Sequence, residues 1–309
     1  MKKVFIDGSS GTTGLRIRER LSKRDDIEII EIAADKRKDN NEKKKLLNSC
    51  DIAFLCLPDD AARESVSLID NPDVVVFDTS TAHRTDADWT YGFPELSGKH
   101  FEKVKNSKRV AVPGCHASGF IALVYPLVEA GILSKDALLT CLSLTGYSGG
   151  GKKMIAEYEE DAPGYTKAPR QYGITQQHKH LKEMKAITGI DNEPLFCPIV
   201  SNFYSGMQVT VPLFIEQLND GFGIEDIIKV YENKFKGPMV KYNSDLADGG
   251  FINSNALEMK DSMNVAVYGN EDRIILVAVY DNLGKGASGA AIECMNIVMG
   301  ADITTGLDI

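Results

Sequence analysis

The sequence predicts an α/β protein in two parts, a doubly wound parallel sheet followed by an α+β domain with a mixed or antiparallel sheet. Up to about residue 115, short apolar runs alternate with stretches of helical periodicity, the pattern of a parallel sheet with helices between its strands. Beyond that point the apolar runs are longer and less helix separates them. A glycine-rich turn directly after the first strand is the third observation. The 309 residues are enough for two domains of ordinary size.

The individual elements follow from the same patterns. In the first part, apolar runs predict strands at residues 4–6, 27–32, 51–58, 74–78 and 109–112. Helical spacing predicts helices at 15–21, 43–47 and 60–69. In the second part, strands are expected at 141–144, 207–214, 263–268 and 274–279. Helices are expected at 120–133, 181–187 and 284–299, and the glycine-rich stretch 146–151 is expected to be a loop.

Composition and charge narrow the class of protein. Hydrophobic residues make up 43% and charged residues 26%, which is ordinary for a globular enzyme. The formal net charge of −9 argues against nucleic acid or an anionic membrane surface as the main partner. We find neither a signal peptide nor an apolar stretch long enough to span a bilayer. The six cysteines are scattered without C-x-x-C or zinc-type spacing, so we expect separate reduced thiols, a cytoplasmic location and no metal site.

The motif GSSGTTG at residues 8–14 has the glycine spacing of a dinucleotide fingerprint. It lies between the first strand and the first helix, where the backbone can approach a pyrophosphate and the helix N-terminus presents unpaired N–H groups. We therefore expect a Rossmann-type dinucleotide domain. The residues expected to hold the phosphates are Gly8, Ser10, Gly11, Thr12, Thr13 and Gly14.

The residues after the second strand indicate which dinucleotide binds. NAD-binding domains carry an acidic residue there, which bonds the ribose 2′-hydroxyl. Here Asp35 is followed by three cations, Lys36, Arg37 and Lys38. Cations suit a 2′-phosphate, so the pattern favours NADP, with Arg37 and Lys38 as ligands. The alternative is a solvated basic loop on an acidic protein.

Cys115 is the candidate nucleophile. The motif PGCHASG at 113–119 places it after a predicted strand and at the start of a predicted helix. The helix dipole there lowers the pKa of a thiol and favours the thiolate, and nearby backbone N–H groups can form an oxyanion hole. The alternative is a buried structural cysteine, but the small residues around Cys115 favour an exposed backbone.

The sequence does not single out one histidine as the proton partner of that thiolate. His116 is adjacent in sequence, and adjacency alone makes poor reaction geometry. His178 and His180 lie just ahead of the predicted helix 181–187, at a junction where catalytic side chains often stand. By sequence alone, either of these two is equally well an exposed surface histidine.

Taken together, six motifs resemble those of the N-acetyl-gamma-glutamyl-phosphate reductases in their shorter form, over nearly the whole chain. They are GSSGTTG at 8–14, GFPEL at 92–96, PGCHASG at 113–119, GYSGGGK at 146–152, HKHLKEM at 178–184 and DNLGKGASG at 281–289. The chain departs from the family pattern at Val112, where asparagine is common, and at Lys182, where many members have proline.

The resemblance implies reduction of N-acetyl-L-glutamyl 5-phosphate by NADPH to the 5-semialdehyde, with phosphate release, in arginine biosynthesis. It implies a thioester on Cys115 and gives the acid–base role to His180, with His178 as the alternative. Our candidates for binding this substrate are the cations Arg84, Lys152 and Arg170, supported by Ser148 and Ser118. The alternative for each is a solvated surface side chain. Asn282 and Lys285 are expected at the nicotinamide end of the cofactor.

The resemblance also implies a domain organisation. Residues 1–115 are expected to form the NADP-binding domain, on which the C-terminal helix 283–309 packs. Residues 116–282 are expected to form the catalytic and oligomerisation domain of a homodimer or homotetramer. Two rival functions are an acyl-phosphate reductase of the aspartate-semialdehyde dehydrogenase type and a non-catalytic NADP sensor. A thiol hydrolase is weaker, because it leaves the glycine turn unexplained.

Overall fold

The computed structural model describes residues 1–160 and 162–309, which fall into two compact units. The first unit comprises Met1–Pro94, Lys99–Pro113 and Ala287–Leu307. The second comprises Glu95–Gly98, Gly114–Gly286 and Asp308–Ile309. No helix in the described residues has the length and apolar character needed to cross a bilayer.

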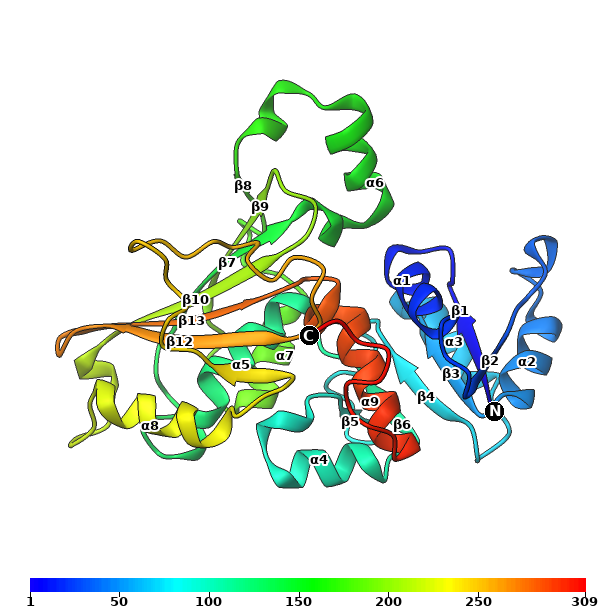
Figure 1. The fold of residues 1–309 in the computed structure, drawn as a ribbon, viewed down its shortest axis with the longest axis horizontal. Helices are drawn as coiled ribbons and strands as arrows, with labels where there is room; N and C mark the ends of the chain where they lie inside the picture. The colour runs from blue at the N-terminus through cyan, green and yellow to red at the C-terminus, as the bar shows by residue number, and fades with distance from the viewer. The chain divides into compact units, whose positions relative to one another are not determined.

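The first unit is built on six parallel strands in the order β2-β1-β3-β4-β6-β5 (Figure 1). The strands are β1 (Lys2–Asp7), β2 (Ile27–Ile30), β3 (Ile52–Leu55), β4 (Val75–Asp78), β5 (Thr90–Tyr91) and β6 (Arg109–Ala111). The helices are α1 (Thr12–Leu21), α2 (Asn40–Ser49), α3 (Asp59–Ser67), α4 (Gly98–Lys105) and α9 (Gly289–Met299). The predicted parallel sheet is therefore confirmed.

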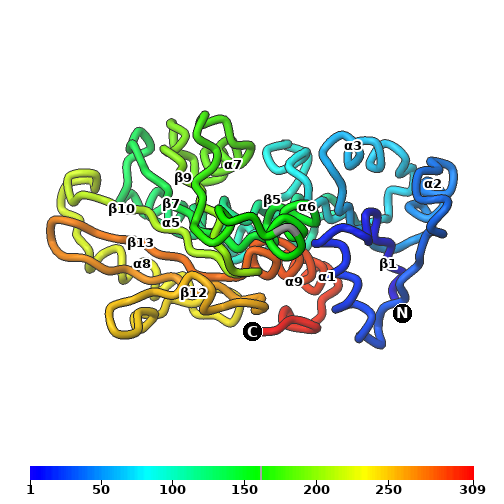
Figure 2. The backbone as a smooth tube through the Cα atoms, turned by 90° about the horizontal axis from the view of Figure 1, so that it is seen from above, coloured from blue at the N-terminus to red at the C-terminus, as the bar shows by residue number. Residues whose placement is uncertain are grey.

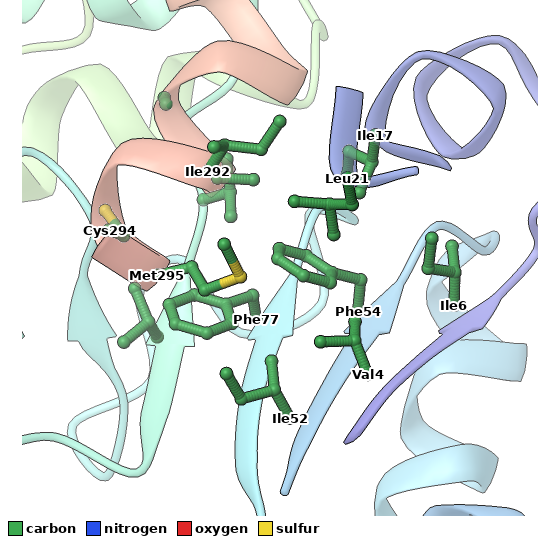
Figure 3. Close-up of a cluster of buried hydrophobic side chains, with 14 of the residues drawn as sticks. Val4, Ile6, Ile17, Leu21, Ile52, Phe54, Phe77, Ile292, Cys294 and Met295 are labelled. Carbon is green, nitrogen blue, oxygen red and sulfur yellow. The ribbon is translucent and has the colours of Figure 1, made fainter. Parts of the chain in front are cut away.

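Both faces of this sheet are covered, because alternate strand residues enter different clusters. Val4 on one face packs in a cluster with Ile17 of α1 and Ile292 of α9 (Figure 3). Phe5, the next residue along β1, packs on the opposite face with Leu47 of α2. Two-sided burial explains why the strands read as continuous apolar runs rather than as alternating patterns. The sheet is thus doubly wound, as predicted.

The chain leaves the first unit at Pro113 and returns to it at Ala287. The returning helix α9 packs the side chain of Met295 against the cluster that contains Phe54 and Phe77 (Figure 3). These two phenylalanine rings stack with centroids 5.1 Å apart. Deletion of α9 would therefore expose the apolar core of the first sheet.

The second unit contains a seven-stranded mixed sheet in the order β11-β12-β13-β10-β7-β9-β8. The strands are β7 (Thr140–Gly146), β8 (Arg170–Gln171), β9 (Leu195–Ser201), β10 (Met207–Phe214), β11 (Val240–Tyr242), β12 (Met263–Gly269) and β13 (Arg273–Tyr280). Strands β10, β13 and β12 run side by side and antiparallel (Figure 2). The β7–β9 and β11–β12 pairs are parallel. The expected mixed sheet is confirmed.

Helices α5 (Cys115–Glu129), α7 (His180–Thr188) and α8 (Ile224–Lys234) pack in this unit, and α5 and α8 contact its sheet directly. Helix α5 lies very close to β10, because a Cβ on Gly119 would fall 2.6 Å from a methyl group of Val209. Val209 and its strand neighbours Ser143 and Ala278 are completely buried on this face. Close packing of α5 thus sets the position of its first residue, Cys115.

Some expectations need correction. The predicted loop 146–151 is wrong in part, since a 3-10 turn (Tyr147–Gly150) leads into the helix α6 (Gly151–Ala156). The N–H groups of Tyr147 and Ser148 hold this turn by donating to the carbonyl oxygens of Phe203 and Tyr204, contacts that local sequence does not encode. The expected elements also omitted the helices α4 and α8, the strand β9, which contains Pro198, and the short strands β5, β8 and β11.

The unit limits also differ from the predicted domain limits of 1–115 and 116–282. Gly114 and Cys115 belong to the second unit, because helix α5 starts at Cys115 and packs on the second sheet. Residues 283–286 belong to the second unit as well, so the returning segment of the first unit begins at Ala287 instead of residue 283.

Candidate active site

The glycine turn lies where the strand order of the first sheet reverses, between β1 and β3. Gly8 has φ +87°, and a Cβ there would lie 2.2 Å from the carbonyl oxygen of Cys56, just after β3. A Cβ on Gly14 would lie 2.4 Å from the carbonyl oxygen of Gly8. These two glycines are thus required by the turn itself. The carboxyl edge of an open parallel sheet at such a reversal is where this fold class binds ligands.

The start of α1 fits a dinucleotide phosphate. A Cβ on Gly11 would meet only ordinary contacts, the nearest at 3.5 Å, so internal packing does not demand glycine there. Gly11 is the N-cap of α1, makes no side-chain cap, and is followed by a first turn without acidic residues. Ser10 is exposed, and Thr12 and Thr13 are partly exposed on the same turn. Such a helix start presents its N–H groups and dipole to an anion.

The basic segment after β2 also lies in the first unit. Lys36 ends a short 3-10 turn, and its Nζ lies 3.4 Å from a carboxylate oxygen of Glu42. Arg37 and Lys38 have exposed side chains. Glu42 partly neutralises Lys36, so Arg37 and Lys38 are the stronger candidates for an anionic ligand.

Arg84, predicted to bind substrate, is buried in the first unit. Its Nε donates to the carbonyl oxygen of Val112 and its Nη2 to that of Thr79, each at 2.9 Å. The guanidinium thus ties the end of β4 to the end of β6, just ahead of Pro113. Val112, one of the two departures from the family motifs, is itself buried and contributes this carbonyl.

Cys115 is the first residue of α5, as the sequence predicted. The N-cap Gly114 makes no side-chain cap, and the first turn contains no acidic residue. The thiol is partly exposed. Gly286 approaches it closely, since a Cβ on that glycine would lie 3.1 Å from the Cβ of Cys115. A thiol with this exposure at a helix N-terminus is a suitable nucleophile.

Two side chains hold the backbone on either side of Cys115. A carboxylate oxygen of buried Glu183, on α7, accepts the N–H of Gly114 at 2.7 Å. The hydroxyl of Tyr280, at the end of β13, donates to the carbonyl oxygen of Cys115 and accepts the N–H of Gly119 at 3.0 Å. Because Glu183 occupies the Gly114 N–H, oxyanion donors would have to come from the later N–H groups of the first turn.

Three histidine rings form one cluster, and one of them belongs to His116, the residue after Cys115. The ring of His116 lies 5.8 Å from that of His178 and 5.6 Å from that of His180, measured between centroids. The rings of His178 and His180 are 4.8 Å apart, and Phe196 of β9 packs against two of the three rings. His180 is buried as the first residue of α7, and His178 is partly exposed in the loop before it.

The environment shifts the pKa values of two of these histidines in the same direction. Burial, with a smaller effect of His178, lowers the pKa of His116 to about 3. Burial, with a smaller effect of the neighbouring Lys179 charge, also lowers the pKa of His178. His116 is therefore neutral at physiological pH, and a neutral imidazole is available as a proton acceptor at His178.

The structure brings two predicted ligands together. Asn282, predicted for the cofactor, donates from Nδ2 to the Ser148 hydroxyl, predicted for the substrate, at 3.0 Å. Its Oδ1 accepts the N–H of Gly206 at 3.0 Å. Ser118 is buried, and its hydroxyl donates to the carbonyl oxygen of Gly114 at 3.1 Å. All three side chains therefore have internal roles in the second unit.

The remaining predicted cations of the second unit differ in their surroundings. Arg170 pairs with Glu157 at 3.0 Å, and its guanidinium lies over the rings of Tyr158 and Tyr165. Lys152 is exposed on α6. Lys285 is almost fully buried and pairs with Glu95. Of the three, Lys152 has the most exposed side chain.

Sequence reasoning assigned no role to four side chains that shape this site: Ser143, Tyr172, Glu183 and Tyr280. Glu183 had a signal, since it follows His180 by three residues and so lies on the same face of α7. Tyr280 is on β13 and Ser143 on β7, and sheet register decides that both lie on the face toward α5. Tyr172 follows the edge strand β8. No local pattern indicates those contacts.

Three other thiols are disfavoured as thiolates. Burial raises the pKa of Cys50 and of Cys56 to about 12, and it raises that of Cys141 further. The six cysteines are single thiols rather than disulfides. Among the described residues, no three His, Cys, Asp or Glu side chains are arranged to hold a metal ion.

Both units match models of one protein family. Residues 3–104 match the NAD binding domain of semialdehyde dehydrogenases, and residues 115–282 match their dimerisation domain. Solved aspartate-semialdehyde dehydrogenases share the fold over almost the whole chain. That of Francisella tularensis is 14% identical with a TM-score of 0.72, covering 97% of this chain and 100% of that one. That of Candida albicans, with NADP, is 17% identical with a TM-score of 0.66, covering 98% and 99%.

Curated relatives are much closer in sequence. N-acetyl-gamma-glutamyl-phosphate reductase 2 of a Nostoc species is 45% identical over 99% of both chains. The enzyme of that family from Sinorhizobium medicae is 42% identical over 97% of this chain and 99% of its own. On this similarity across both units, the chain belongs to the N-acetyl-gamma-glutamyl-phosphate reductases of the semialdehyde dehydrogenase family.

Proposed function

We propose that this protein reduces N-acetyl-L-glutamyl 5-phosphate to N-acetyl-L-glutamate 5-semialdehyde with NADPH and releases phosphate, as a step of arginine biosynthesis. The names of its relatives support the substrate. The observation that carries the chemistry is Cys115, which starts α5 directly before His116, one member of a cluster of three histidines. The first unit is the NADP-binding domain in this proposal, and the second is catalytic.

The reaction begins on Cys115. An acyl phosphate is a good acyl donor, so the thiolate attacks its carbonyl carbon and phosphate leaves with the electrons of the C–O bond. First-turn N–H groups of α5 stabilise the developing oxyanion. The product of this half-reaction is a thioester on Cys115. Glu183 and Tyr280 keep the loop rigid during the attack, since each bonds its backbone.

Bound NADPH supplies the hydride that this thioester carbonyl accepts. The residues that would hold it are the glycine turn at 8–14 and the start of α1, with Arg37 and Lys38 toward the 2′-phosphate. On the protein side, His180 protonates the oxygen of the resulting thiohemiacetal and removes that proton when the C–S bond breaks. His178 is the alternative acid–base group, and its lowered pKa favours the base form.

Five side chains are proposed to bind the substrate: Arg84, Ser118, Ser148, Lys152 and Arg170. Lys152 is the strongest candidate for the phosphate, because its ammonium is exposed on α6, directly after the Ser148 turn. Arg84 and Ser118 both donate hydrogen bonds to backbone carbonyl oxygens. These bonds favour an indirect role, in which the two side chains shape the loop around Cys115. Asn282 is proposed to fix Ser148.

We further propose that the protein is a homodimer or homotetramer in the cytoplasm. Support for the assembly comes from the sheet of the second unit, whose face opposite α5 exposes Leu142, Phe214 and Ile275. Exposed apolar side chains gathered on one sheet face are typical of an interface. Support for the compartment comes from the six unbridged thiols.

The test is the reverse reaction. Purified protein is mixed with N-acetylglutamate semialdehyde, NADP and inorganic phosphate, and NADPH formation is followed by its absorbance. We expect turnover that depends on phosphate and is much faster than with aspartate semialdehyde. A preference for aspartate semialdehyde would favour the rival reductase, and NADP binding without any turnover would favour the sensor.

A further inference from the structure

The carboxylate of Asp281 has no task in the reaction described above, although it begins the motif DNLGKGASG directly after β13. Asp281 is completely buried. Its Oδ1 accepts the N–H groups of Leu283 and Gly284, each at 2.8 Å. Its Oδ2 accepts the N–H of Met259 at 2.8 Å and the hydroxyl of Ser205. One side chain therefore takes four hydrogen bonds from three segments of the second unit.

These donors require a carboxylate at position 281. An ionised carboxylate accepts hydrogen bonds at both oxygens and has no proton of its own to donate. An amide of the same shape has only one accepting oxygen. In either orientation its NH2 group would face at least one backbone N–H, that of Met259 or those of Leu283 and Gly284. The charge and the shape of Asp281 are thus both used by its neighbours.

The turn at 281–286 packs against two other segments, each time at a glycine. A Cβ on Gly284 would lie 1.9 Å from the carbonyl oxygen of Lys260. A Cβ on Gly286 would lie 3.1 Å from the Cβ of Cys115 and 3.4 Å from its Cα. The Gly286 N–H also donates to the backbone carbonyl oxygen of Asp281 at 3.0 Å. The position of Asp281 therefore sets how closely Gly286 approaches Cys115.

The segment on which Gly284 packs depends on the same carboxylate. Met259, whose N–H bonds Asp281, has φ +66°, a left-handed conformation that is uncommon outside glycine. Such backbone conformations persist only where surrounding contacts hold them. The Met259 side chain is 52% exposed, so the backbone contacts matter more here than side-chain packing. Loss of the Asp281 carboxylate would loosen this segment together with the turn.

Cys115 is held at two points by β13 and the turn that follows it. The Tyr280 hydroxyl donates to the backbone carbonyl oxygen of Cys115, and Gly286 lies against the Cβ. With the backbone and the Cβ fixed, the direction of the sulfur depends only on χ1. Attack on a carbonyl carbon requires the sulfur to be aligned with the oxyanion donors, and a small misplacement costs much of the rate.

We propose that Asp281 is a positioning residue of the reductase site, whose carboxylate fixes the turn at 281–286 so that Gly286 holds Cys115 in the direction needed for attack. Asp281 acts through Gly286 and makes no contact with substrate in this role. Asn282, which bonds Ser148, is fixed by the same turn. The inference rests on the proposed function only in taking Cys115 as the nucleophile, and it holds for any activated acyl donor.

The main experiment separates the alignment of the sulfur from its ionisation in Asp281→Asn. Alkylation by iodoacetamide needs an accessible thiolate and no oxyanion donors. Acylation by p-nitrophenyl acetate needs the thiolate to attack a carbonyl carbon, which expels p-nitrophenolate and leaves a thioester. The variant should be acylated at Cys115 about tenfold or more slowly than the unmodified protein. Its alkylation rate should stay within about twofold. Peptide mass spectrometry identifies the modified residue in both reactions.

Gly286→Ala tests the contact itself. The new Cβ must displace Cys115 or the turn, so acylation should again slow by about tenfold or more. Combining it with Asp281→Asn should cost less than the product of the two separate losses, because both changes act on one contact. Should Asp281→Asn fail to fold, as seen by circular dichroism, Ser205→Ala takes its place. It removes one of the four donors and should give a smaller loss of the same kind.

The matched controls use a similar pair of residues at the start of α8. Oδ2 of Asp226 accepts the N–H of Gly223 at 3.1 Å, and Gly223 has open space for a Cβ. The pair closely follows Asn219, which bonds Gly131 just beyond the far end of α5. Asp226→Asn and Gly223→Ala should leave both the acylation and the alkylation of Cys115 unchanged.

Acylation at the normal rate in folded Asp281→Asn would overturn the proposal. Equal losses of acylation and alkylation would also overturn it, because they would mean a lost thiolate rather than a misaligned one. Neither reagent needs NADPH or N-acetylglutamyl phosphate. Slow acylation with normal alkylation, but no reverse reaction in the unmodified protein, would therefore reject the proposed substrate and keep the role of Asp281. An unmodified protein whose Cys115 is not acylated would reject both.

Discussion

At the scale of single residues, chemistry separates Cys115 from the other thiols. Cys50 and Cys141 are buried, and burial disfavours their thiolates. Cys115 is partly exposed and begins a helix, where the first-turn N–H groups and the dipole favour a negative charge. The surroundings of a thiol, rather than its presence, therefore decide which cysteine can act as the nucleophile.

Cys115→Ser should abolish reduction while NADPH still binds, because a serine hydroxyl is much harder to ionise than a thiol and is a weaker nucleophile. Turnover is measured with the reverse assay, and NADPH binding by its fluorescence. Cys197→Ser, a partly exposed thiol on β9, is the control and should keep full activity. Substantial turnover in Cys115→Ser would refute the covalent route.

His180→Asn should lower kcat by about 100-fold or more, the usual contribution of a general acid–base group. His178→Asn should cost less, although its ring lies only 4.8 Å from that of His180. Steady-state rates of both variants across pH make the comparison. If only His178→Asn shows the large loss, the assignment of the acid–base role to His180 is wrong.

At the scale of elements, the glycine turn contains two glycines that the fold needs and one that internal packing does not require. Gly8 and Gly14 have no room for a side chain within the protein itself. Gly11 has room and an extended backbone with φ −75°, which alanine also adopts. Substitutions in this one motif can therefore separate an effect on folding, at Gly8 or Gly14, from an effect on cofactor binding, at Gly11.

Gly8→Ala should lower the free energy of unfolding by about 2 kcal/mol or more, because φ is positive and the new Cβ collides with a carbonyl oxygen. Gly11→Ala should change stability by only about 0.5 kcal/mol and still weaken NADPH binding. Urea unfolding and NADPH titration make the comparison. Equal stability losses at both positions would contradict this division.

The basic segment after β2 has a separate test. Replacing Arg37 and Lys38 by serine should narrow the preference for NADPH over NADH by about tenfold or more. The loss of each cation removes part of the attraction for the 2′-phosphate. The ratio of kcat/KM for the two cofactors is the measurement. Lys45→Ser, exposed on α2, is the control. An unchanged ratio would mean that other residues read the 2′-phosphate.

At the scale of the whole molecule, the second sheet has two unlike faces. Residues facing α5, such as Val209 and Val211, are completely buried. On the opposite face, Ile275 pairs with Pro212, and Phe214 with Arg273, and both apolar side chains are largely exposed. A second copy that covers this face would remove the apolar surface from water.

Phe214→Lys with Ile275→Lys should therefore shift the protein toward a smaller species, because charges on this face resist burial. Sedimentation velocity across a concentration range measures the assembly. Glu225→Lys on α8 is the control, since α8 packs on the other side of the sheet. A monomeric unmodified protein, or an assembly that tolerates both lysines, would exclude this face as the interface.

The sequence by itself determined the two-part architecture, five of the six strands of the parallel sheet, the glycine turn and the helix start at Cys115. These features depend on local rules: apolar runs, glycines at turns and small residues at helix starts. The family motifs added the reaction and the set of candidate ligands.

Only the tertiary structure decided which groups meet around Cys115. The contacts of Glu183 with Gly114, of Tyr280 with Cys115 and of Tyr172 with His116 join residues from 56 to 165 positions apart. Such contacts depend on sheet register and on how α5 and α7 pack, which no local pattern encodes. The same is true of Asn282, which was expected at the cofactor and bonds Ser148. The candidate nucleophile could thus be proposed from the chain alone, but the contacts that position it required the fold.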